Sequence, residues 1–225
     1  MKRFGLMVVL IALLASMALP ALANDAPVLS AWAKDEAFAA EKAGILPQDY
    51  LYGDLRGSGT RGQAAGYLVK LAETVLQKEL PNDAAGVFPD LKNTYPVIVE
   101  NAEKAYSAGI VTGYEDGSFG RRNEITREEY AVMLYRMFRY LEQESGAQLL
   151  PNPDEVQMHP FADEAEISAW ALDAVRALAY MGILGGDNWG AFRPAGTVSL
   201  EQMIVLSYRC WLRCAPVCTE GSENA

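Results

Sequence analysis

The stretch AGIVTGYEDGSFGRRNEITREE, residues 108–129, decides the fold, because it holds the end of one helix, a tight loop and the start of another helix. Gly109 followed by two aliphatic residues is typical of a helix C-cap with its hydrophobic contact. The Asp-Gly pair in the loop is a tight-turn signal. Thr126 and Glu129 match the capping-box pattern, which predicts a helix whose first residue is Arg127.

Arg127 is unusual at the start of a helix. A cation there faces the positive end of the helix dipole, which costs a few tenths of a kcal/mol, up to ~1, unless an anion lies nearby. One interpretation is that Arg127 holds an external anion. The other is that it pairs with Glu128, Glu129 or another acidic neighbour and is merely a surface residue, since exposed ion pairs are common and weak.

The same pattern recurs along the chain, which indicates three internal repeats. Two further capping signals occur, Thr60-Arg61-Gly62-Gln63 and Ser199-Leu200-Glu201-Gln202. Upstream of the three caps, amphipathic or alanine-rich segments end at glycines, and the glycine-to-cap distances are 16, 17 and 17 residues for Gly44, Gly109 and Gly182. The second and third copies also carry Phe-x-Asp, starting 21 residues before the glycine at Phe88 and Phe161. In the first copy this phenylalanine would fall inside the N-terminal apolar segment, so the first copy is truncated at its start and lacks the motif.

Each capped segment carries one apolar stripe at helical spacing. The stripe positions are Ala64, Tyr67, Leu68, Leu71, Ala72 and Val75; Tyr130, Met133, Leu134, Met137, Phe138 and Leu141; and Met203, Leu206 and Cys210. Phe119 and Phe192 align in the loops and are expected to plug each turn into the core. One such unit is too short to bury its stripe alone, so the three are expected to pack together through these helices.

The N-terminus and the net charge indicate an exported, acidic protein. Residues 1–23 show two cations, a short apolar run and a small-x-small cleavage signal, which predicts a secretory signal peptide. Loss of Lys2 and Arg3 would change the formal charge from −10 to −12. Nucleic-acid binding leaves a basic footprint, so nucleic acid is not expected as a partner.

The three cysteines cluster at the C-terminus, and in an exported chain they favour a disulfide over a metal site. C-x3-C-x3-C with one distant histidine, His159, is a poor zinc pattern. A local disulfide between Cys214 and Cys218 is the candidate pairing; an intermolecular disulfide is the alternative. The Asp116-Gly117 loop lacks the alternating oxygen ligands of an EF-hand. We expect neither metal nor cofactor.

The order of these motifs resembles the S-layer homology domain family: Phe-x-Asp, a tryptophan, a helix, Gly-aliphatic-aliphatic, a Gly-Tyr-x-Asp-Gly-x-Phe loop, then Ile-Thr-Arg-Glu-Glu. The resemblance implies an all-α fold of three tandem helix-loop-helix repeats in a pseudo-threefold spindle around a central helical bundle. The expected divisions are the signal peptide 1–23, repeats at 24–80, 86–142 and 159–214, and a tail at 215–225.

The resemblance also implies a function. Members of the family hold proteins non-covalently on bacterial cell walls by binding secondary cell-wall polysaccharides, often with a pyruvate ketal, in grooves between repeats. The arginine of the Thr-Arg-x-Glu motif, which the family uses against the carboxylate, matches Arg127 and Arg61. The third copy has Leu200 instead, so at most two grooves carry this arginine.

Other candidate ligand residues follow from the aligned copies. Trp32 and Trp170 each lie 12 residues before their glycine and have two interpretations: core anchors of the first helix, or a groove wall that stacks on a sugar. Asp90 and Asp163 suit local caps, and in the family this aspartate also borders the groove. The capping glycines Gly109 and Gly182 complete the set.

Three functions were compared. The main hypothesis is a module in the cell wall or surface layer that binds a wall glycan, either a secondary cell-wall polymer or peptidoglycan, and that could hold a protein partner through the C-terminal cysteines. A self-associating surface-lattice or envelope-spacing protein is the alternative. A wall-polymer hydrolase needs two carboxylates flanking the scissile bond, one of them with a raised pKa, and no such pair stands out. We therefore expect that this protein is not an enzyme.

Overall fold

The computed structural model describes residues 26–47, 51–156 and 160–220, and for residues 215–220 it describes the backbone. The predicted signal peptide, His159 and the side chain of Cys218 lie outside the described parts. Within these ranges the chain is helical and forms only isolated β-bridges, which confirms the predicted all-α fold class. The α-helices are α1 (Lys34–Lys42), α2 (Arg61–Leu76), α3 (Pro96–Ser107), α4 (Arg127–Ser145), α5 (Leu172–Tyr180) and α6 (Leu200–Glu220), with 3-10 turns η1 (Pro89–Leu91), η2 (Pro153–Glu155) and η3 (Glu164–Glu166).

The long helices α2, α4 and α6 start where the capping boxes predict. Thr60 accepts from the Gln63 amide at the start of α2, and the Gln63 side chain accepts from the Thr60 amide. Thr126 and Glu129 do the same at α4, and Ser199 and Gln202 at α6. The three boxes satisfy amides that a helix start would otherwise leave unpaired.

The short helices α1, α3 and α5 end at the predicted glycines. Gly44, Gly109 and Gly182 have φ values of +69°, +68° and +72°, which glycine adopts without strain. The amide of the residue that follows each glycine donates to the carbonyl five residues back, as at Ile110 and Ala105 (2.8 Å), which is a Schellman motif. The following isoleucines, Ile45, Ile110 and Ile183, are fully buried and close each motif.

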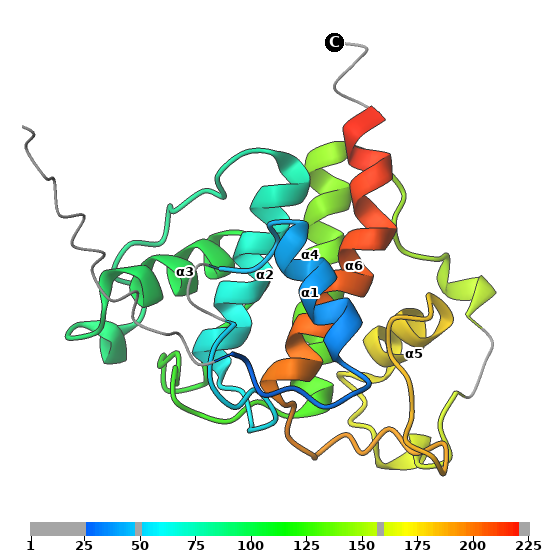
Figure 1. Ribbon diagram of the computed structural model, residues 1–225. Coiled ribbons are helices and arrows are strands. Elements are labelled where there is room, and N and C mark those ends of the chain that lie inside the picture. The colour runs from blue at the N-terminus through cyan, green and yellow to red at the C-terminus, as the bar shows by residue number, and fades with distance from the viewer. Residues whose placement is uncertain (1–25, 48–50, 157–159, 221–225) are drawn as a thin grey trace, which may run out of the picture.

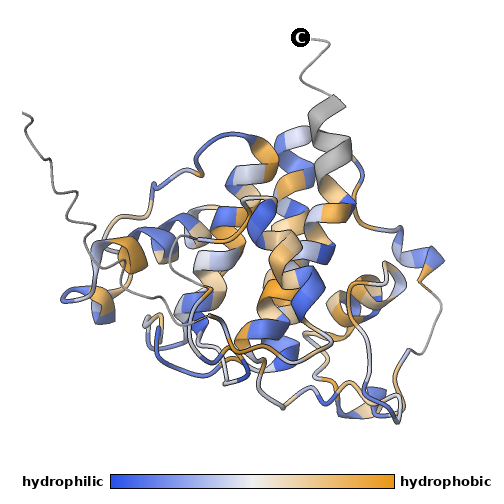
Figure 2. Ribbon diagram, viewed as in Figure 1, coloured by the Kyte–Doolittle hydropathy of each residue, from blue (hydrophilic) through white to orange (hydrophobic). Residues whose placement is uncertain are grey.

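Helices α2, α4 and α6 run through the middle of the molecule and carry the hydrophobic core (Figures 1 and 2). Every residue of the three predicted stripes is buried, and so are Phe119 and Phe192. The Tyr130 hydroxyl of α4 reaches the Met203 carbonyl and the Ser207 hydroxyl of α6, 3.4 Å from each. The expected packing of three units through their second helices is therefore present in the structure.

The outer helices pack in a circular order. Helix α1 packs on α6, α3 packs on α2, and α5 packs on α4, so each first helix covers the second helix of the preceding unit. In Figure 1, α3 and α5 lie on opposite sides of the central helices, and α1 lies in front of them. The outer helix of each unit thus packs against the central helix of a neighbouring unit, so the core is shared between units.

A ring of backbone hydrogen bonds joins the three units at one end of the central bundle. The Gly59 amide donates to the Val198 carbonyl (2.7 Å), the Val198 amide to Ile125 (3.1 Å), and the Ile125 amide to Gly59 (3.2 Å). All three residues immediately precede a helix cap. The same backbone contact therefore recurs at the starts of α2, α4 and α6. In the described part of the chain, no helix is long and apolar enough to cross a membrane.

Candidate ligand-binding grooves

Two recesses contain the arginines that the sequence singles out. The Arg61 groove, about 180 Å³, is lined by Arg61, Val111, Thr112, Gly113, Tyr114, Glu129, Val132, Met133, Arg136 and Trp170. The Arg127 groove, about 610 Å³, is lined by Trp32, Arg127, Leu184, Gly185, Gly186, Asp187, Asn188, Ala191, Phe192, Arg193, Gly196, Thr197, Gln202, Val205, Leu206 and Arg209. Each groove receives residues from all three units.

The two grooves are built alike. Each has the arginine at the first residue of one central helix, the loop after the glycine of the next unit, and one face of the following central helix. Glu129 and Arg136 on α4 match Gln202 and Arg209 on α6, and Trp170 matches Trp32. The circular packing therefore assembles equivalent side chains at two of the three junctions.

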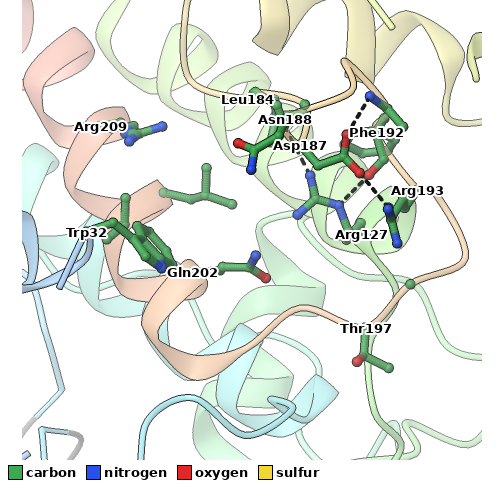
Figure 3. A pocket seen from close by; sticks show the side chains of 16 residues that line it. Trp32, Arg127, Leu184, Asp187, Asn188, Phe192, Arg193, Thr197, Gln202 and Arg209 are labelled. Carbon is green, nitrogen blue, oxygen red and sulfur yellow. Dashed lines mark hydrogen bonds and ion pairs between the residues drawn. The ribbon is translucent and has the colours of Figure 1, made fainter. Parts of the chain in front are cut away.

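Arg127 is held by backbone carbonyls and an aromatic ring (Figure 3). Its Nε donates to the Phe192 carbonyl (2.6 Å) and its Nη2 to the Gly185 carbonyl (3.2 Å). The guanidinium carbon lies 4.9 Å from the centroid of the Phe192 ring. Burial lowers the pKa of Arg127, while the charges of Asp163 and Asp187 oppose this shift. The arginine thus holds the loop of the next unit against α4.

Arg61 makes the same kind of contact, with one guanidinium hydrogen bond instead of two. Its Nη2 donates to the Thr112 carbonyl (2.6 Å), and its guanidinium carbon lies 4.9 Å from the centroid of the Tyr114 ring. The residue is only 8% exposed. Its Nε is buried and has no hydrogen-bond partner among the described residues.

The alternative interpretation, in which Arg127 is a surface residue paired with Glu128 or Glu129, does not hold, because Arg127 is half-buried and neither carboxylate binds it. Glu128 accepts from the Ser168 amide (2.9 Å) and hydroxyl (3.0 Å), at the approach to α5. Glu129 is used in the capping box of α4. Both carboxylates are engaged elsewhere, so the compensation for the helix dipole comes from carbonyl groups instead.

The helix-start amides are also unavailable to a ligand. The Arg127 amide donates to the Gly196 carbonyl (2.8 Å) and the Glu128 amide to Pro194 (3.1 Å). In α2 the amides of Arg61 and Gly62 donate to carbonyls of the second unit. Because the third amide is taken by the cap, an anion in either groove cannot use the first three amides of the helix.

The tryptophans lie at the surface, so the interpretation as core anchors is wrong. Trp32 is 54% exposed and Trp170 is 59% exposed. In Figure 3, Trp32 and Arg209 lie on one side of the Arg127 groove, and Arg127 and Arg193 lie on the other. The aligned position in the second unit, Val97, is also exposed. Each tryptophan therefore forms a groove wall.

Asp90 and Asp163 fix the loops that bear the groove residues. Asp90 accepts from the amides of Phe119 and Gly120, 2.9 Å each. Asp163 accepts from Phe192 and Arg193, 2.7 Å each. Each aspartate caps a turn that lies 29 and 30 residues further along the sequence. Asp163 thereby positions the Phe192 carbonyl that Arg127 binds.

The other predicted positions are structural in different ways. Gly109 ends α3 and lines a neighbouring recess of about 580 Å³ that shares Arg136 with the Arg61 groove. Gly182 ends α5, and the side chain of Arg213 lies beside it. Leu200, which replaces the arginine at the third junction, is half-buried and packs against the core.

Three further arginines line the grooves and were not predicted from the sequence: Arg136, Arg193 and Arg209. Arg209 donates to Glu36 of α1 (3.1 Å), and Arg193 donates to Asp187 (2.7 Å). A signal was present: a cation lies ten residues after every cap, at Lys70, Arg136 and Arg209. Arg193 had no such signal, because its aligned residue is Gly120.

Arg193 adopts a backbone conformation that favours glycine. Its φ is +56°, and Gly120 has φ +69° at the same place in the second unit. A side chain at Gly120 would collide with Tyr114. In the third unit the residue aligned with Tyr114 is Asp187, whose carboxylate accepts a hydrogen bond from Arg193. Backbone amides hold the pKa of Asp187 below its ordinary value. A non-glycine residue with positive φ at a candidate site is a strained position that suggests a function.

The C-terminal cysteines lie in α6 on its buried side. Cys210 and Cys214 are both fully buried, and the Cys214 thiol donates to the Cys210 carbonyl (3.1 Å). Burial raises the pKa of the Cys210 thiol. The predicted Cys214–Cys218 disulfide involves a side chain outside the described parts, and it stays a prediction. Among the described residues, no group of three His, Cys, Asp or Glu residues could hold a metal ion.

Comparisons with known proteins match the middle and C-terminal units. The family model of the S-layer homology domain matches residues 87–131 and 160–204. The endoglucanase of Bacillus sp. (strain KSM-635) is 35% identical over 125 residues, covering 55% of this chain and 12% of the relative. The exoglucanase XynX of Acetivibrio thermocellus is 30% identical over 154 residues, covering 66% of this chain and 12% of the relative.

A third relative is named as a cell surface protein and not as an enzyme. The cell surface glycoprotein 1 of Acetivibrio thermocellus is 24% identical over 151 residues, covering 67% of this chain and 6% of the relative. The chain thus spans about a tenth or less of the length of these relatives. Residues 87–131 and 160–204 thus each match the S-layer homology domain, the family that the order of the sequence motifs resembles.

Proposed function

We propose that this chain is a non-catalytic module that holds a protein on the cell wall by binding an acidic wall polysaccharide in the Arg61 and Arg127 grooves. The observation that carries the proposal is the pairing, in both grooves, of an exposed tryptophan with arginines. An aromatic face suits the apolar face of a sugar ring, and guanidinium groups suit a carboxylate. A pyruvate ketal on the polysaccharide, as the family resemblance implies, is one such acid group.

The relatives support attachment at the cell envelope. They include two glucanases and a cell surface glycoprotein, and this chain matches only a small share of each. A segment common to proteins of such different names is better explained as an attachment module than as a catalytic domain. We also propose that residues 24–80 are a third, truncated copy beside the copies at 86–142 and 159–214, since α1 and α2 repeat the caps and glycine of the other units.

The groove carboxylates support a non-catalytic role. Glycoside hydrolysis needs a carboxyl group whose pKa is raised, so that it can act as an acid. Asp187 has a lowered pKa because backbone amides donate to it. Glu129 is committed to a helix cap. Neither has the environment of a general acid.

Sedimentation with purified cell walls tests the proposal. The wild-type chain should sediment with walls and remain in solution after the acidic polymer has been chemically removed, because the peptide-crosslinked mesh lacks the acid group. The double variant Arg61→Ala/Arg127→Ala, verified as folded by circular dichroism, should remain largely in solution with intact walls. Sedimentation that is unchanged by removal of the polymer would contradict the proposal.

A self-associating envelope protein is the competing hypothesis, and exposed aromatic side chains outside the groove linings favour it. Tyr95 is 76% exposed and Trp189 is 77% exposed. Light scattering separates the two hypotheses. A binding module keeps the mass of one chain as concentration rises, whereas a lattice protein increases in mass.

A further inference from the structure

The cations of the Arg127 groove already have partners within the protein. Arg209 donates through Nε to both carboxylate oxygens of Glu36, at 3.1 and 3.3 Å, and Arg193 forms an ion pair with Asp187 at 2.7 Å. Arg127 itself donates to two carbonyls. An anion that entered this groove would have to compete with resident carboxylates for two of the three guanidinium groups.

The Arg61 groove is different at the corresponding position. Arg136, the counterpart of Arg209, makes no hydrogen bond or ion pair within the described part of the chain, although it is half-buried. In the Arg61 guanidinium group, only Nη2 donates to a described residue. Burial and the charge of Arg61 both lower the pKa of Arg136, so two like charges face one recess with little compensation.

One carboxylate lines the Arg61 groove. The Oε2 atom of Glu129 accepts from the Thr126 amide (2.9 Å) and hydroxyl (3.1 Å), so the side chain is held at the helix start. The recess measures about 180 Å³, against about 610 Å³ for the Arg127 groove. A compact acid group fits the smaller recess, whereas the larger one has room for further sugar units.

We propose that Arg136 is a second ligand-binding arginine, that the acid group of the ligand binds between Arg61 and Arg136, and that Glu36 keeps the Arg127 groove weak for anions. The inference rests on the proposed function for the identity of the natural ligand. The two grooves then have different roles: the Arg61 groove selects the acid group, and the Arg127 groove contacts mainly the sugar.

Titration of the full chain with simple anions tests this division, because each groove contains its own tryptophan. The indole N–H signals of Trp170 and Trp32 in a ¹H–¹⁵N spectrum report on the Arg61 and Arg127 grooves. Acetate and inorganic phosphate, added at constant ionic strength with chloride as the reference, should shift the Trp170 signal at lower concentration than the Trp32 signal.

Variants at matched positions make the test specific. Arg136→Gln should weaken the Trp170 response about tenfold, since charge-assisted hydrogen bonds are the stronger kind, and Arg136→Lys should weaken it less. Arg209→Gln, at the equivalent position of the other groove, should leave the Trp170 response unchanged. Glu36→Gln should strengthen the Trp32 response by releasing Arg209. Circular dichroism confirms that each variant is folded.

Equal responses of the two tryptophans, or an Arg136→Gln variant that binds as the wild type does, would overturn the inference. Such a result would leave the proposed function standing if the wild-type chain still sedimented with walls in a polymer-dependent way. Conversely, a failure to bind walls would remove the proposed function, and the anion titration would still decide the role of Arg136.

Discussion

At the scale of single residues, the protein places arginines where helix electrostatics disfavours them and compensates with carbonyl oxygens and aromatic rings. Arg127 binds the carbonyls of Phe192 and Gly185, and Arg61 binds that of Thr112. The sequence alone predicted the positions of both arginines correctly. It could not predict their partners, since a backbone carbonyl in a distant loop leaves no mark in residue type.

Charge at the third residue of α4 should tune anion binding. Glu129→Gln should keep the capping box, because Gln63 and Gln202 occupy this position in the caps of α2 and α6. The change removes the one carboxylate that lines the Arg61 groove. A charge pair at a partly exposed site is worth about 0.2–1 kcal/mol, so acetate should bind roughly 1.4-fold to fivefold more tightly.

The measurement is the same titration of the Trp170 indole signal, with thermal unfolding as the control for the cap. An unchanged or weaker response in a variant of wild-type stability would show that Glu129 does not oppose anion binding.

At the scale of the elements, local signals and long-range contacts differ in how well the sequence predicts them. The caps at Thr60, Thr126 and Ser199 and the glycine ends of α1, α3 and α5 are in the structure where the sequence predicts them. These signals depend on residues within one turn of each other. The circular packing of α1 on α6, α3 on α2 and α5 on α4 had no such local signature, because a cap does not specify its neighbour.

Two carboxylates connect units at the second residue of a central helix. Glu201 of α6 accepts from the Ser30 amide and hydroxyl, 2.8 Å each, and Glu128 of α4 accepts in the same way from Ser168. At the third junction the aligned residues are Gly62 and Tyr95, and a buried lysine joins α3 to α2 instead, through the Lys104–Glu73 pair at 2.9 Å. The glutamates therefore fix the approach to α1 and α5.

Replacing one of these glutamates by alanine should show how much it contributes to the free energy of unfolding. Glu201 is 4% exposed, whereas Glu128 is half-buried. Because a hydrogen bond to a charged group contributes about 1.5–3 kcal/mol, Glu201→Ala should lower the free energy of unfolding by about 2–3 kcal/mol. The matched variant Glu128→Ala should lower it less.

Urea unfolding of Glu201→Ala, Ser30→Ala and the double variant measures the coupling. We expect the double variant to be less destabilised than the sum of the single variants, since both changes remove the same contact. Additive effects, or a Glu201→Ala variant within about 0.5 kcal/mol of the wild type, would mean that the contact does not hold α1 in place.

At the scale of the whole molecule, three units that lack cores of their own make one cooperative fold. The backbone ring of Gly59, Ile125 and Val198 joins them at one end of the central bundle, and the core is continuous across α2, α4 and α6. The sequence predicted the repeats and the shared core from the stripes. Grooves between the repeats were implied only by the family resemblance, and the sequence could not predict which side chains meet in them, because residues of three units meet at each junction.

A chain shortened to residues 86–214 should not fold, although it contains both matched family segments. It would lack α2, on which α3 packs, and α1, which covers α6. The full chain should unfold in a single transition, as cooperative domains do. Circular dichroism should show a large loss of helix in the shortened chain, whereas cooperative unfolding of that chain near wild-type stability would contradict the shared core.

The central claim is that both grooves, with their exposed tryptophans, bind an acidic wall polysaccharide. The most direct measurement is a ¹H–¹⁵N spectrum of the full chain during titration with oligosaccharide released from purified walls. The chain has four tryptophans, and the account predicts that the indole signals of Trp32 and Trp170 shift while that of Trp211, which packs against the core, stays in place. Saturable binding of the oligosaccharide with the Trp32 and Trp170 signals unmoved would contradict it.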